Sequence, residues 1–435
     1  MKQQRILVTL VFVSIGVFGC GLVVADDLDA AKFWPHWRGP TGNSISPHGQ
    51  PPVSWSDSKN VKWKVVIPGY GSASPIIWQD KVFIVTAVPA GSVKPAGPKD
   101  KRQTPRRFKL LCLDRATGKT LWDRASVEAT PHEGHHGDHN YASASPCTDG
   151  ERVYAHFGSR GLFCYDFEGQ LQWKKTDFPR MKIMNQFGEG SSPTVHDDMI
   201  IVPWDHEGQS YLLALDKRTG EQRWKTERDE PTNWATPLVV EYGGKKQVVM
   251  NGERLARGYD FTTGKELWSC PGQVRRPVAS PVAGHGLVFV GSGHLGAFLA
   301  AFRLDGRGDL KGTKAVAWSL DRQTPDIPSP LLSGERLFFH AGKGGTLSCH
   351  DAVSGKKHFT ERVEGLDRVY ASPVAANGKI YLTGRDGTTV VIEDSDTFKV
   401  VATNHLPEGI DATPAIAGDQ IFLRTRGHLY CVDEQ

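Results

Sequence analysis

The sequence has few cysteines, and their spacing argues against two kinds of redox site. Seven cysteines occur in 435 residues, and no two of them are adjacent or stand at CxxC spacing. The chain therefore lacks the usual signals of thiol redox chemistry and of covalent haem attachment. A large excess of charge is also missing, because 52 basic and 48 acidic residues leave a net charge of +4. This balance does not favour nucleic-acid binding, which usually shows a clustered basic stripe.

The first 25 residues differ from the rest of the chain. Residues 1–5 form a short basic stretch, residues 6–24 form an apolar run, and the small residue Ala25 precedes an acidic pair. This order is typical of a cleaved export signal. We therefore expect an exported protein, located in the periplasm or elsewhere in the cell envelope. A retained membrane anchor is the alternative, because the run is long enough to span a bilayer.

Cys20 is a candidate lipidation site, because it follows Gly19 within the apolar run. The bulky Phe18 argues against lipidation, since lipoprotein signals prefer a small residue at that position. We expect membrane association only if Cys20 is lipidated or if the signal stays uncleaved.

A Ser-Pro or Thr-Pro pair recurs eight times at a nearly fixed interval. The intervals are 71, 47, 44, 44, 49, 43 and 41 residues. A period in the forties is typical of one supersecondary unit that is repeated around an axis. The first residues of the pairs are Ser74, Ser145, Ser192, Thr236, Ser280, Ser329, Ser372 and Thr413.

The second repeat shows the unit most clearly. Short strands are predicted at residues 142–148, 152–157, 162–166 and 171–173, with turns that contain Gly or Asp between them. Four such strands form one antiparallel meander.

A second marker supports this register. An Asp is followed by Thr-Gly and then by a Trp eight residues after the Asp, at 114–122, 216–224 and 260–268, and more weakly at 351–359. Glycine supplies the positive φ that a tight hairpin needs. The Trp ring is large enough to fill the gap between neighbouring sheets. We therefore expect structural roles for these residues.

The last repeat ends after Asp433 with three strands, and the start of the chain offers a fourth. Residues 61–67 precede the first Ser-Pro pair and carry Trp63 in the fourth-strand position. Pairing the two ends removes open sheet edges. We predict an all-β fold, an eight-bladed β-propeller of four-stranded antiparallel blades that is closed by this N-terminal strand. The predicted divisions are a signal peptide at 1–25, a lead-in segment at 26–59 and the propeller at 60–435.

Four cysteines occupy one position in four repeats, two residues before an Asp: Cys112, Cys164, Cys349 and Cys431. Equivalent positions of different blades lie beyond the ~7 Å Cα separation that a disulfide allows. We expect these cysteines to be buried and small rather than bridged, although export would allow disulfides.

These motifs resemble the pyrroloquinoline-quinone (PQQ)-like repeat, in which a strand ending in Asp leads into x-x-Thr-Gly-Lys-x-x-Trp. The resemblance covers residues 60–435. Residues 34–40 and 54–56 are similar to the lead-in of exported bacterial PQQ-like propellers, which are often likened to BamB, an outer-membrane assembly scaffold. One branch of this superfamily, the quinoprotein alcohol dehydrogenases, implies PQQ, calcium, a vicinal disulfide and a catalytic Asp. The chain has no adjacent cysteines, is shorter and shows no matching acid cluster.

The missing features favour the BamB-like branch, which presents loops to protein partners and binds no quinone. We predict a non-catalytic binding or scaffolding module of the cell envelope, with no catalytic residues and no expected cofactor. One alternative is an oxidoreductase of the quinoprotein type that uses PQQ and calcium. The other is a glycan-binding or carbohydrate-active propeller. The repeat specifies blades and not chemistry, so these alternatives stay open.

The long loops gather on one face. In a meander, the second-to-third loops and the blade-to-blade loops share a face, here called the long-loop face. The loops at 88–107, 126–141 and 178–190 belong to it, whereas the hairpin at 305–313 lies opposite. Binding residues tend to sit on loops held by a rigid scaffold. We therefore expect an envelope protein or an anionic ligand to bind this face.

The loop at 132–139 is rich in histidine. Its imidazoles are candidate ligands for zinc or another borderline metal, with Asp138 as a carboxylate ligand and Glu133 to orient a histidine. The spacing matches no defined metal motif, so we favour a solvated loop. The low-prior metal candidates are His132, His135, His136 and His139.

Two sets of basic residues remain on the long-loop face. The first set lies in the proline-rich insertion at 88–107, for which we favour a solvated loop over a binding surface for anionic partners. Its basic residues are Lys94, Lys99, Lys101, Arg102, Arg106 and Arg107. By register, other arginines lie around the mouth of the central channel, where guanidinium groups suit carboxylate or phosphate. The anion-binding candidates are Arg254, Arg276, Arg368, Arg385 and Arg424. The alternative is pairing with nearby acids: Asp326, Asp367, Asp386 and Asp411.

Overall fold

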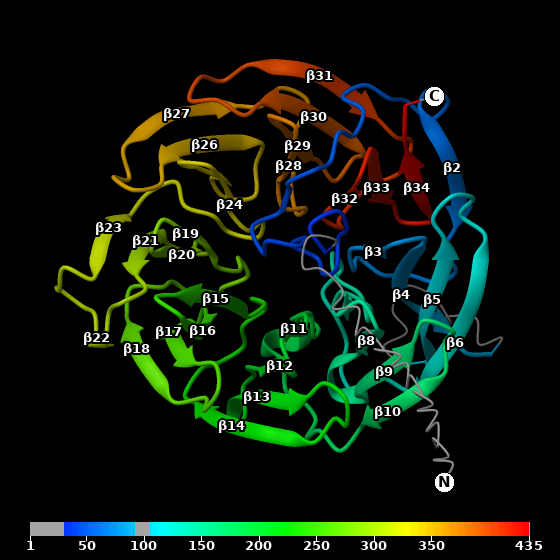
Figure 1. Cartoon of the computed structure of the whole chain (residues 1–435), viewed down its shortest axis with the longest axis horizontal. Coiled ribbons are helices and arrows are strands. Elements are labelled where there is room, and N and C mark those ends of the chain that lie inside the picture. The colour runs from blue at the N-terminus through cyan, green and yellow to red at the C-terminus, as the bar shows by residue number, and fades with distance from the viewer. Residues whose placement is uncertain (1–29, 92–103, 435) are drawn as a thin grey trace, which may run out of the picture.

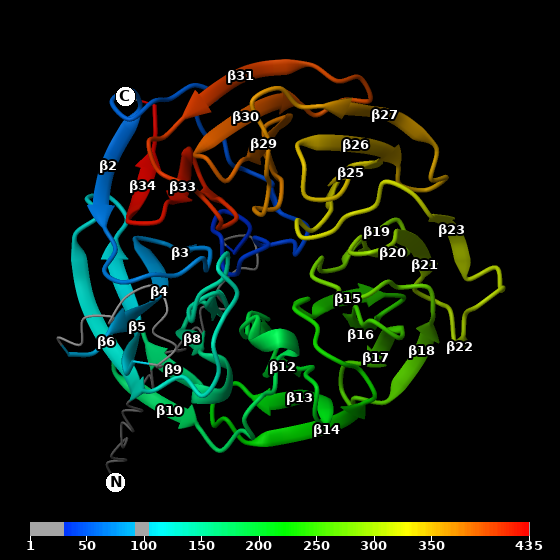
Figure 2. The same ribbon diagram turned by 180° about the vertical axis from the view of Figure 1, so that it is seen from behind.

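The strands of the chain form a closed ring of sheets around a central axis (Figure 1; Figure 2 shows the ring from behind). The computed structural model describes residues 30–91 and 104–434. Within these ranges the strands assemble into eight sheets, which are the blades of the predicted β-propeller. The predicted export signal, Cys20 and four basic residues of the insertion (Lys94, Lys99, Lys101 and Arg102) lie outside the described residues. In the described part, no helix is both long and apolar enough to cross a bilayer.

The first four blades follow one another from blue to green in Figure 1. Blade 1 comprises β3 (Ile76–Trp78), β4 (Lys81–Pro89), β5 (Arg106–Asp114) and β6 (Thr120–Ala129). Blade 2 comprises β7 (Cys147–Thr148), β8 (Arg152–His156), β9 (Leu162–Asp166) and β10 (Leu171–Lys175), with the short 3-10 helix η1 (Gly158–Arg160) before β9. Blade 3 follows η2 (Met184–Gln186) and comprises β11 (Thr194–His196), β12 (Met199–Trp204), β13 (Ser210–Asp216) and β14 (Gln222–Arg228). Blade 4 comprises β15 (Leu238–Tyr242), β16 (Lys245–Met250), β17 (Ala256–Asp260) and β18 (Glu266–Cys270), with β22 (Gly308–Asp309) at its outer edge.

The remaining four blades complete the ring from green to red. Blade 5 comprises β19 (Val282–Gly284), β20 (Leu287–Ser292), β21 (Phe298–Arg303) and β23 (Val316–Leu320). Blade 6 comprises β24 (Leu331–Ser333), β25 (Arg336–His340), β26 (Thr346–Asp351) and β27 (Lys357–Arg362). Blade 7 comprises β28 (Val374–Ala376), β29 (Lys379–Thr383), β30 (Thr388–Glu393) and β31 (Val400–His405), with β1 (Ile45–Ser46) at its inner edge. Blade 8 comprises β32 (Ala415–Ala417), β33 (Gln420–Arg424), β34 (His428–Val432) and β2 (Val61–Val66).

The structure departs from the predicted unit in three details. Two of the described sheets hold a fifth strand: β1 pairs in parallel with β28, and β22, from the hairpin at 305–313, pairs in parallel with β18. In blade 2 the first strand is confined to β7 and is shorter than the predicted 142–148. The six cysteines among the described residues are buried and free, which confirms the prediction made for Cys112, Cys164, Cys349 and Cys431.

The Ser-Pro and Thr-Pro pairs link the blades around the channel. In seven of the eight junctions of the described ring, the N–H of this Ser or Thr donates to the hydroxyl oxygen of its equivalent in the next blade. Ser280 N, for example, lies 2.9 Å from Ser329 Oγ. At the eighth junction Arg424 Nη1 instead donates to Ala73 O at 2.9 Å. The proline that follows has no N–H to leave unpaired, which suits the start of an inner edge strand.

A Trp at the position of the second marker ties five of the described blades to the next blade, whereas Trp268 Nε1 donates to Gln247 Oε1 of its own blade. Trp122 Nε1 donates to Phe167 O of blade 2 at 2.8 Å. Its ring lies so close to Gly169 that a Cβ there would be 2.7 Å from a ring atom, and Gly169 has a φ of 77°. Only glycine meets both demands. The predicted gap-filling role is therefore confirmed, and the same bond is made by Trp63, Trp173, Trp224 and Trp318.

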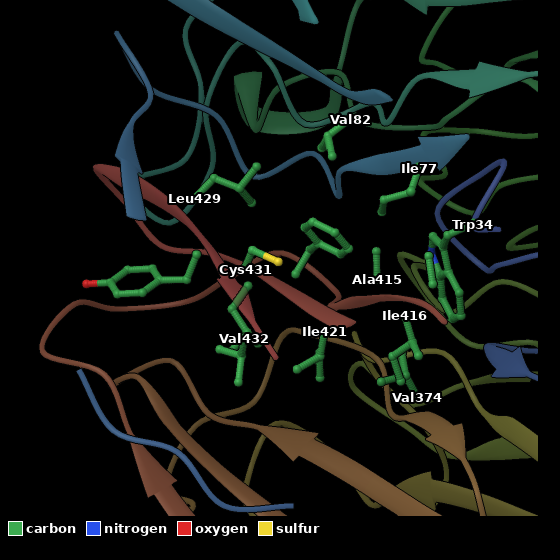
Figure 3. Close-up of a cluster of buried hydrophobic side chains, with 14 of the residues drawn as sticks. Trp34, Ile77, Val82, Val374, Ala415, Ile416, Ile421, Leu429, Cys431 and Val432 are labelled. Carbon is green, nitrogen blue, oxygen red and sulfur yellow. The ribbon is translucent and has the colours of Figure 1, made fainter. Parts of the chain in front are cut away.

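The two ends of the chain clasp the ring in blade 8. Strand β2 pairs antiparallel with β34, with Trp63 opposite Cys431, which confirms the predicted closure. The buried cluster at this junction combines side chains of β33 and β34 with Trp34 and Ile77 from the start of the chain (Figure 3). Both Trp34 and Ile77 are fully buried.

The lead-in segment crosses the face opposite the long loops, which we call the turn face. Trp34 N donates to Ile77 O at 2.9 Å in blade 1, and Asn43 Nδ2 donates to Ala283 O at 2.8 Å in blade 5. Strand β1 then pairs with β28 in blade 7. In Figure 1 this segment is the dark blue chain near the centre of the ring. Blades that are distant in sequence are thus tied together at one end of the channel.

Candidate binding site at the mouth of the channel

A cavity of about 470 Å³ opens at the long-loop end of the central channel. The ring of Ser and Thr hydroxyls lines its wall, and Trp37 of the lead-in closes its far end. Second-to-third loops and blade-to-blade loops form its rim. They contribute His136, Asp138, His139, Phe187, Trp234, Arg276, His294, Asp326, Lys343, Tyr370 and Asp411.

The hydroxyls of the ring have protons left to donate. Ser192 Oγ, for example, accepts the N–H of Ser145 at 2.9 Å. That bond uses a lone pair of the oxygen, and a hydroxyl is both an acceptor and a donor. The channel wall therefore offers donors to a ligand that carries hydrogen-bond acceptors.

Arg276 is the one candidate arginine that lines this cavity among the described residues. Within the described chain its guanidinium has no carboxylate partner: Nη1 lies 3.2 Å from His294 Nε2, and the group lies 5.2 Å from the centre of the Phe187 ring. Its backbone has a φ of 58°, which is uncommon outside glycine, and its N–H donates to Glu253 Oε2 at 3.1 Å. Strained backbone of this kind clusters at functional positions.

Other basic groups surround this guanidinium. Burial lowers the pKa of His294; Asp326 opposes that shift, whereas the charges of Lys343 and Arg276 add to it. Burial raises the pKa of Asp326, whose carboxylate lies 3.9 Å from Lys343 Nζ. Because the cations repel one another, a negative group bound between them would be stabilised. This side of the cavity suits an anionic group.

Arg368 and Arg385 pair with acids, but only Asp411 was named as a partner in the alternative interpretation, whereas Asp138, which both arginines contact, was not. Arg385 Nη1 and Arg368 Nη2 each lie 2.9 Å from an oxygen of Asp138, and Arg385 also pairs with Asp411. Tyr370 Oη donates to Asp138 at 3.1 Å. Burial alone would raise the pKa of Asp138, but the hydrogen bonds from Arg385 and Arg368 hold it well below its usual range. The acid offered above as a metal ligand is thus engaged by two arginines.

Arg254 and Arg424 lie away from the cavity. Arg254 is exposed, with Nη1 3.7 Å from Asp229 Oδ2. Arg424 is buried between the last and first blades, where it donates to Ala73 O. Burial lowers its pKa to about 9. Of the five arginines predicted to bind an anion, Arg276 therefore remains as the candidate.

The four histidines of the loop at 132–139 do not converge. His132 Nε2 lies 2.7 Å from Met181 O, and His135 Nδ1 lies 2.8 Å from His136 O. His139 lines the cavity, where burial lowers its pKa to about 4. Among the described residues, no group of three or more His, Cys, Asp or Glu side chains is placed to hold a metal ion.

The described part of the basic insertion extends two strands. Strands β4 and β5 stay paired as far as Pro89 and Arg106. Arg106 lies 5.0 Å from the centre of the Tyr141 ring, and Arg107 Nε lies 2.9 Å from Glu128 Oε2. These two arginines therefore have local partners within the propeller.

Sequence reasoning missed several residues of the cavity, among them Trp37, His294 and Lys343. Trp37 belongs to the lead-in, and no repeat pattern places that segment across the channel. His294 and Lys343 stand in equivalent second-to-third loops of blades 5 and 6, both rich in glycine. A polar residue in a glycine-rich second-to-third loop was the sequence signal that could have identified both as cavity residues.

The profile of one protein family, described as outer membrane protein assembly factor BamB, matches residues 106–361 and 311–435. Together the two matches cover more than half of the sequence. The chain belongs to the BamB family. No curated protein sequence matches the chain significantly.

Solved structures of similar fold include a BamB, an alcohol dehydrogenase and a designed protein. BamB from Moraxella catarrhalis is 13% identical, covers 85% of this chain and 98% of its own, and has a TM-score of 0.59. Quinohemoprotein alcohol dehydrogenase from Comamonas testosteroni is 12% identical, with coverages of 93% and 81% and a TM-score of 0.60. The computationally designed Ika8 protein is 12% identical, with coverages of 85% and 98% and a TM-score of 0.55. At these identities the likeness shows the propeller fold alone.

The described residues of the cavity do not match the calcium site that a PQQ-dependent dehydrogenase implies. Calcium takes about six to eight oxygen ligands, among which carboxylates are prominent. Two of the carboxylates that line this cavity, Asp138 and Asp411, are paired with Arg385, and Asp326 lies beside Lys343. The donor set therefore does not fit calcium.

Proposed function

We propose that this member of the BamB family is a non-catalytic binding module of the cell envelope, and that its long-loop face holds an anionic group of a partner. The observation that carries the proposal is Arg276, which lines the cavity with His294 beside it and no carboxylate partner in the described chain. The envelope location is supported by the family description, which names outer-membrane protein assembly, and by the export pattern of residues 1–25.

The arrangement supports binding better than catalysis. Asp138 and Asp411 are engaged by Arg385, so neither is free to act as a base or as a metal ligand. The hydroxyl ring and the Arg276 guanidinium, which has no carboxylate partner in the described chain, are both donors, and such groups select a ligand rich in acceptors. A carboxylate is the simplest such group, because Arg binds it with two parallel hydrogen bonds.

Citrate, titrated into the mature protein at low ionic strength, tests the anion site. The wild type is expected to bind it in the cavity. Arg276→Gln combined with Lys343→Gln is expected to weaken binding at least tenfold, because two of the cations near the ligand are lost. Arg254→Gln is the matched control, since Arg254 is exposed outside the cavity. Equal losses in both variants, or no binding by the wild type, would contradict the proposal.

A pull-down from envelope extract tests the partner. The mature wild type and the double variant serve as baits, and citrate serves as a competitor. A protein that binds the wild type, is lost from the double variant and is displaced by citrate is the expected partner. Identical capture by both baits would place the partner surface elsewhere.

The two alternatives make different predictions. A quinoprotein oxidoreductase, incubated with PQQ and calcium, would gain a visible chromophore and reduce dyes with alcohols. Glycan binding is favoured by the aromatic side chains of Trp37, Phe187 and Trp234 in the cavity, and predicts binding on a glycan array. Either result would displace the anion proposal.

A further inference from the structure

The contact between Arg276 and His294 at the channel mouth fixes the protonation state of that histidine. Arg276 Nη1 lies 3.2 Å from His294 Nε2, and both residues line the cavity. A guanidinium only donates hydrogen bonds, so Nε2 accepts and carries no proton. His294 is therefore neutral as long as it holds this contact.

The same contact occupies part of the guanidinium. Arg276 Nε faces Met184 Sδ at 3.2 Å, and Nη1 faces His294. An oxyanion binds a guanidinium most strongly through two parallel hydrogen bonds, which need two nitrogens. A proton on His294 Nε2 ends the bond from Arg276, frees Nη1 and adds a positive charge. One protonation thus improves the site for an anion in two ways.

The loop of His294 is packed against the segment that carries Asp326. A Cβ on Gly293 would lie 2.9 Å from Pro325 O and 3.1 Å from Asp326 N, so this close approach requires glycine. His294 is thereby held beside the carboxylate of Asp326, which in turn lies 3.9 Å from Lys343 Nζ.

The charges that act on His294 favour its neutral form while the cavity is empty. Burial lowers its pKa, the charges of Lys343, Arg276 and Arg275 add to that shift, and Asp326 opposes it. An anion bound among these cations would reverse the balance, because it favours the charged imidazole. The other titratable groups of the described lining are His136, Asp138, His139, Tyr370 and Asp411, and Glu253 lies 3.9 Å from Arg275 Nε.

We propose that His294 is a proton switch of the binding site at the channel mouth, so that an oxyanion binds there together with a proton. This inference rests on the proposed function, because it concerns the regulation of the same site. The anion and the proton strengthen each other's binding by the same factor. Anion affinity therefore rises as the pH falls through the range in which His294 titrates, by up to about tenfold per pH unit when one proton is taken up.

Sulfate, titrated into the mature protein between about pH 5 and pH 8 at matched ionic strength, tests this coupling, because it stays a dianion over the range in which histidines titrate. The wild type is expected to bind sulfate more tightly at low pH. Calorimetry in two buffers of different ionisation enthalpy is expected to show proton uptake, up to about one proton per sulfate.

His294→Gln keeps an acceptor for Arg276 but cannot titrate in this range. It is expected to lose most of the pH dependence, while its affinity at about pH 8 stays within about threefold of the wild type, whose His294 is neutral there. His358→Gln is the matched control, because His358 is an exposed histidine of β27 outside the cavity. It is expected to keep the full pH profile.

Asp326 is the other group whose protonation would favour an anion. Asp326→Asn is expected to bind sulfate more tightly at every pH and to keep the pH dependence. A dependence lost in Asp326→Asn but kept in His294→Gln would assign the switch to Asp326 and overturn the role of His294.

The wild type alone also decides the inference. Sulfate affinity that does not rise as the pH falls, binding without proton uptake, or no sulfate binding at any pH overturns it. The proposed function falls only if citrate binding at the channel mouth fails as well, so the two failures are distinguishable.

Discussion

Arg228 and Asp205 form a fully buried pair in blade 3. Arg228 Nε lies 2.8 Å from Asp205 Oδ1 and Nη2 lies 3.0 Å from Oδ2, with side chains 0% and 1% exposed. Arg228 also donates to Tyr259 Oη and to Asn251 O, and Asn233 donates to Asp205. Each polar group of this network is therefore satisfied by a neighbour. The Arg276 guanidinium, by contrast, has no carboxylate partner in the described chain and lines the cavity at the channel mouth.

Asp205→Ala should lower the free energy of unfolding by about 3–5 kcal/mol, because it leaves the Arg228 charge buried and unpaired. Urea denaturation measures the change. The control is Asp80→Ala, which removes a carboxylate that is 68% exposed beside Lys81, and should change stability by no more than about 0.5 kcal/mol. A loss at Asp205 as small as that at Asp80 would show that the pair does not hold blade 3.

Buried histidines predict how stability depends on pH. Burial lowers the pKa of His36, His139, His156 and His340 from 6.5 to about 4. Between these values the unfolded chain binds more protons than the folded one, so stability is highest above about pH 6.5 and falls as the pH drops toward 4. His340→Gln should reduce this slope by up to about 1.4 kcal/mol per pH unit. Urea denaturation across this pH range measures it, and an unchanged slope would contradict the prediction.

At the scale of elements, the junction between blades rests on two repeated hydrogen bonds. One joins the Ser or Thr ring around the channel, and the other joins a Trp in five of the described blades to the turn of the next blade. Short inner strands such as β7 and β24 have few ladder bonds of their own, so these cross-blade bonds complete their pairing. The sequence repeat therefore encodes the hydrogen bonds between neighbouring blades as well as the strands within each blade.

Ser329→Ala should lower the free energy of unfolding by about 1–3 kcal/mol, because it leaves the buried N–H of Ser280 without an acceptor. Ser329→Thr keeps the acceptor and should be close to wild type, since Thr236 and Thr413 already serve in this way. Ser74→Ala is a second control, because no described N–H donates to that hydroxyl. Losses of equal size at positions 74 and 329 would rule out the proposed role of the ring.

The blades and the closing strand were predictable from sequence because each rests on a local, repeated pattern. The Ser-Pro interval located the junctions, and the three-stranded last repeat predicted that β2 would complete blade 8. The path of the lead-in was not predictable, since contacts such as Asn43 with Ala283 have no periodicity. The repeat register also placed Arg276 and Arg385 alike at the channel mouth. It could not show that Arg385 is paired, because its partner Asp138 comes from a loop that is distant in sequence.

At the scale of the whole molecule, the ring depends on a clasp between the two ends of the chain. Trp63 of β2 packs against Phe422 of blade 8, with ring centres 5.9 Å apart, and donates to Arg115 O of blade 1 at 2.9 Å. The clasp thus spans the junction where the hydroxyl ring is interrupted. Opening it would expose the edge of β34, and exposed edges promote association.

Trp63→Ala should cost about 3–5 kcal/mol of stability and cause concentration-dependent association. Trp224→Ala is the matched control: both Trp63 and Trp224 are 8% exposed, and Trp224 makes the equivalent bond to Phe261 O. It should lose similar stability without added association, because its blade is not closed by a chain end. Urea denaturation and sedimentation measure the two effects. Association in both variants, or in neither, would contradict a special role for the clasp.

The crystal structure of the mature protein grown in citrate tests the central claim most directly, that the channel mouth is an anion-binding site. We predict a citrate carboxylate in contact with the Arg276 guanidinium inside the cavity. A cavity without citrate, when citrate is ordered elsewhere on the protein, would contradict the claim.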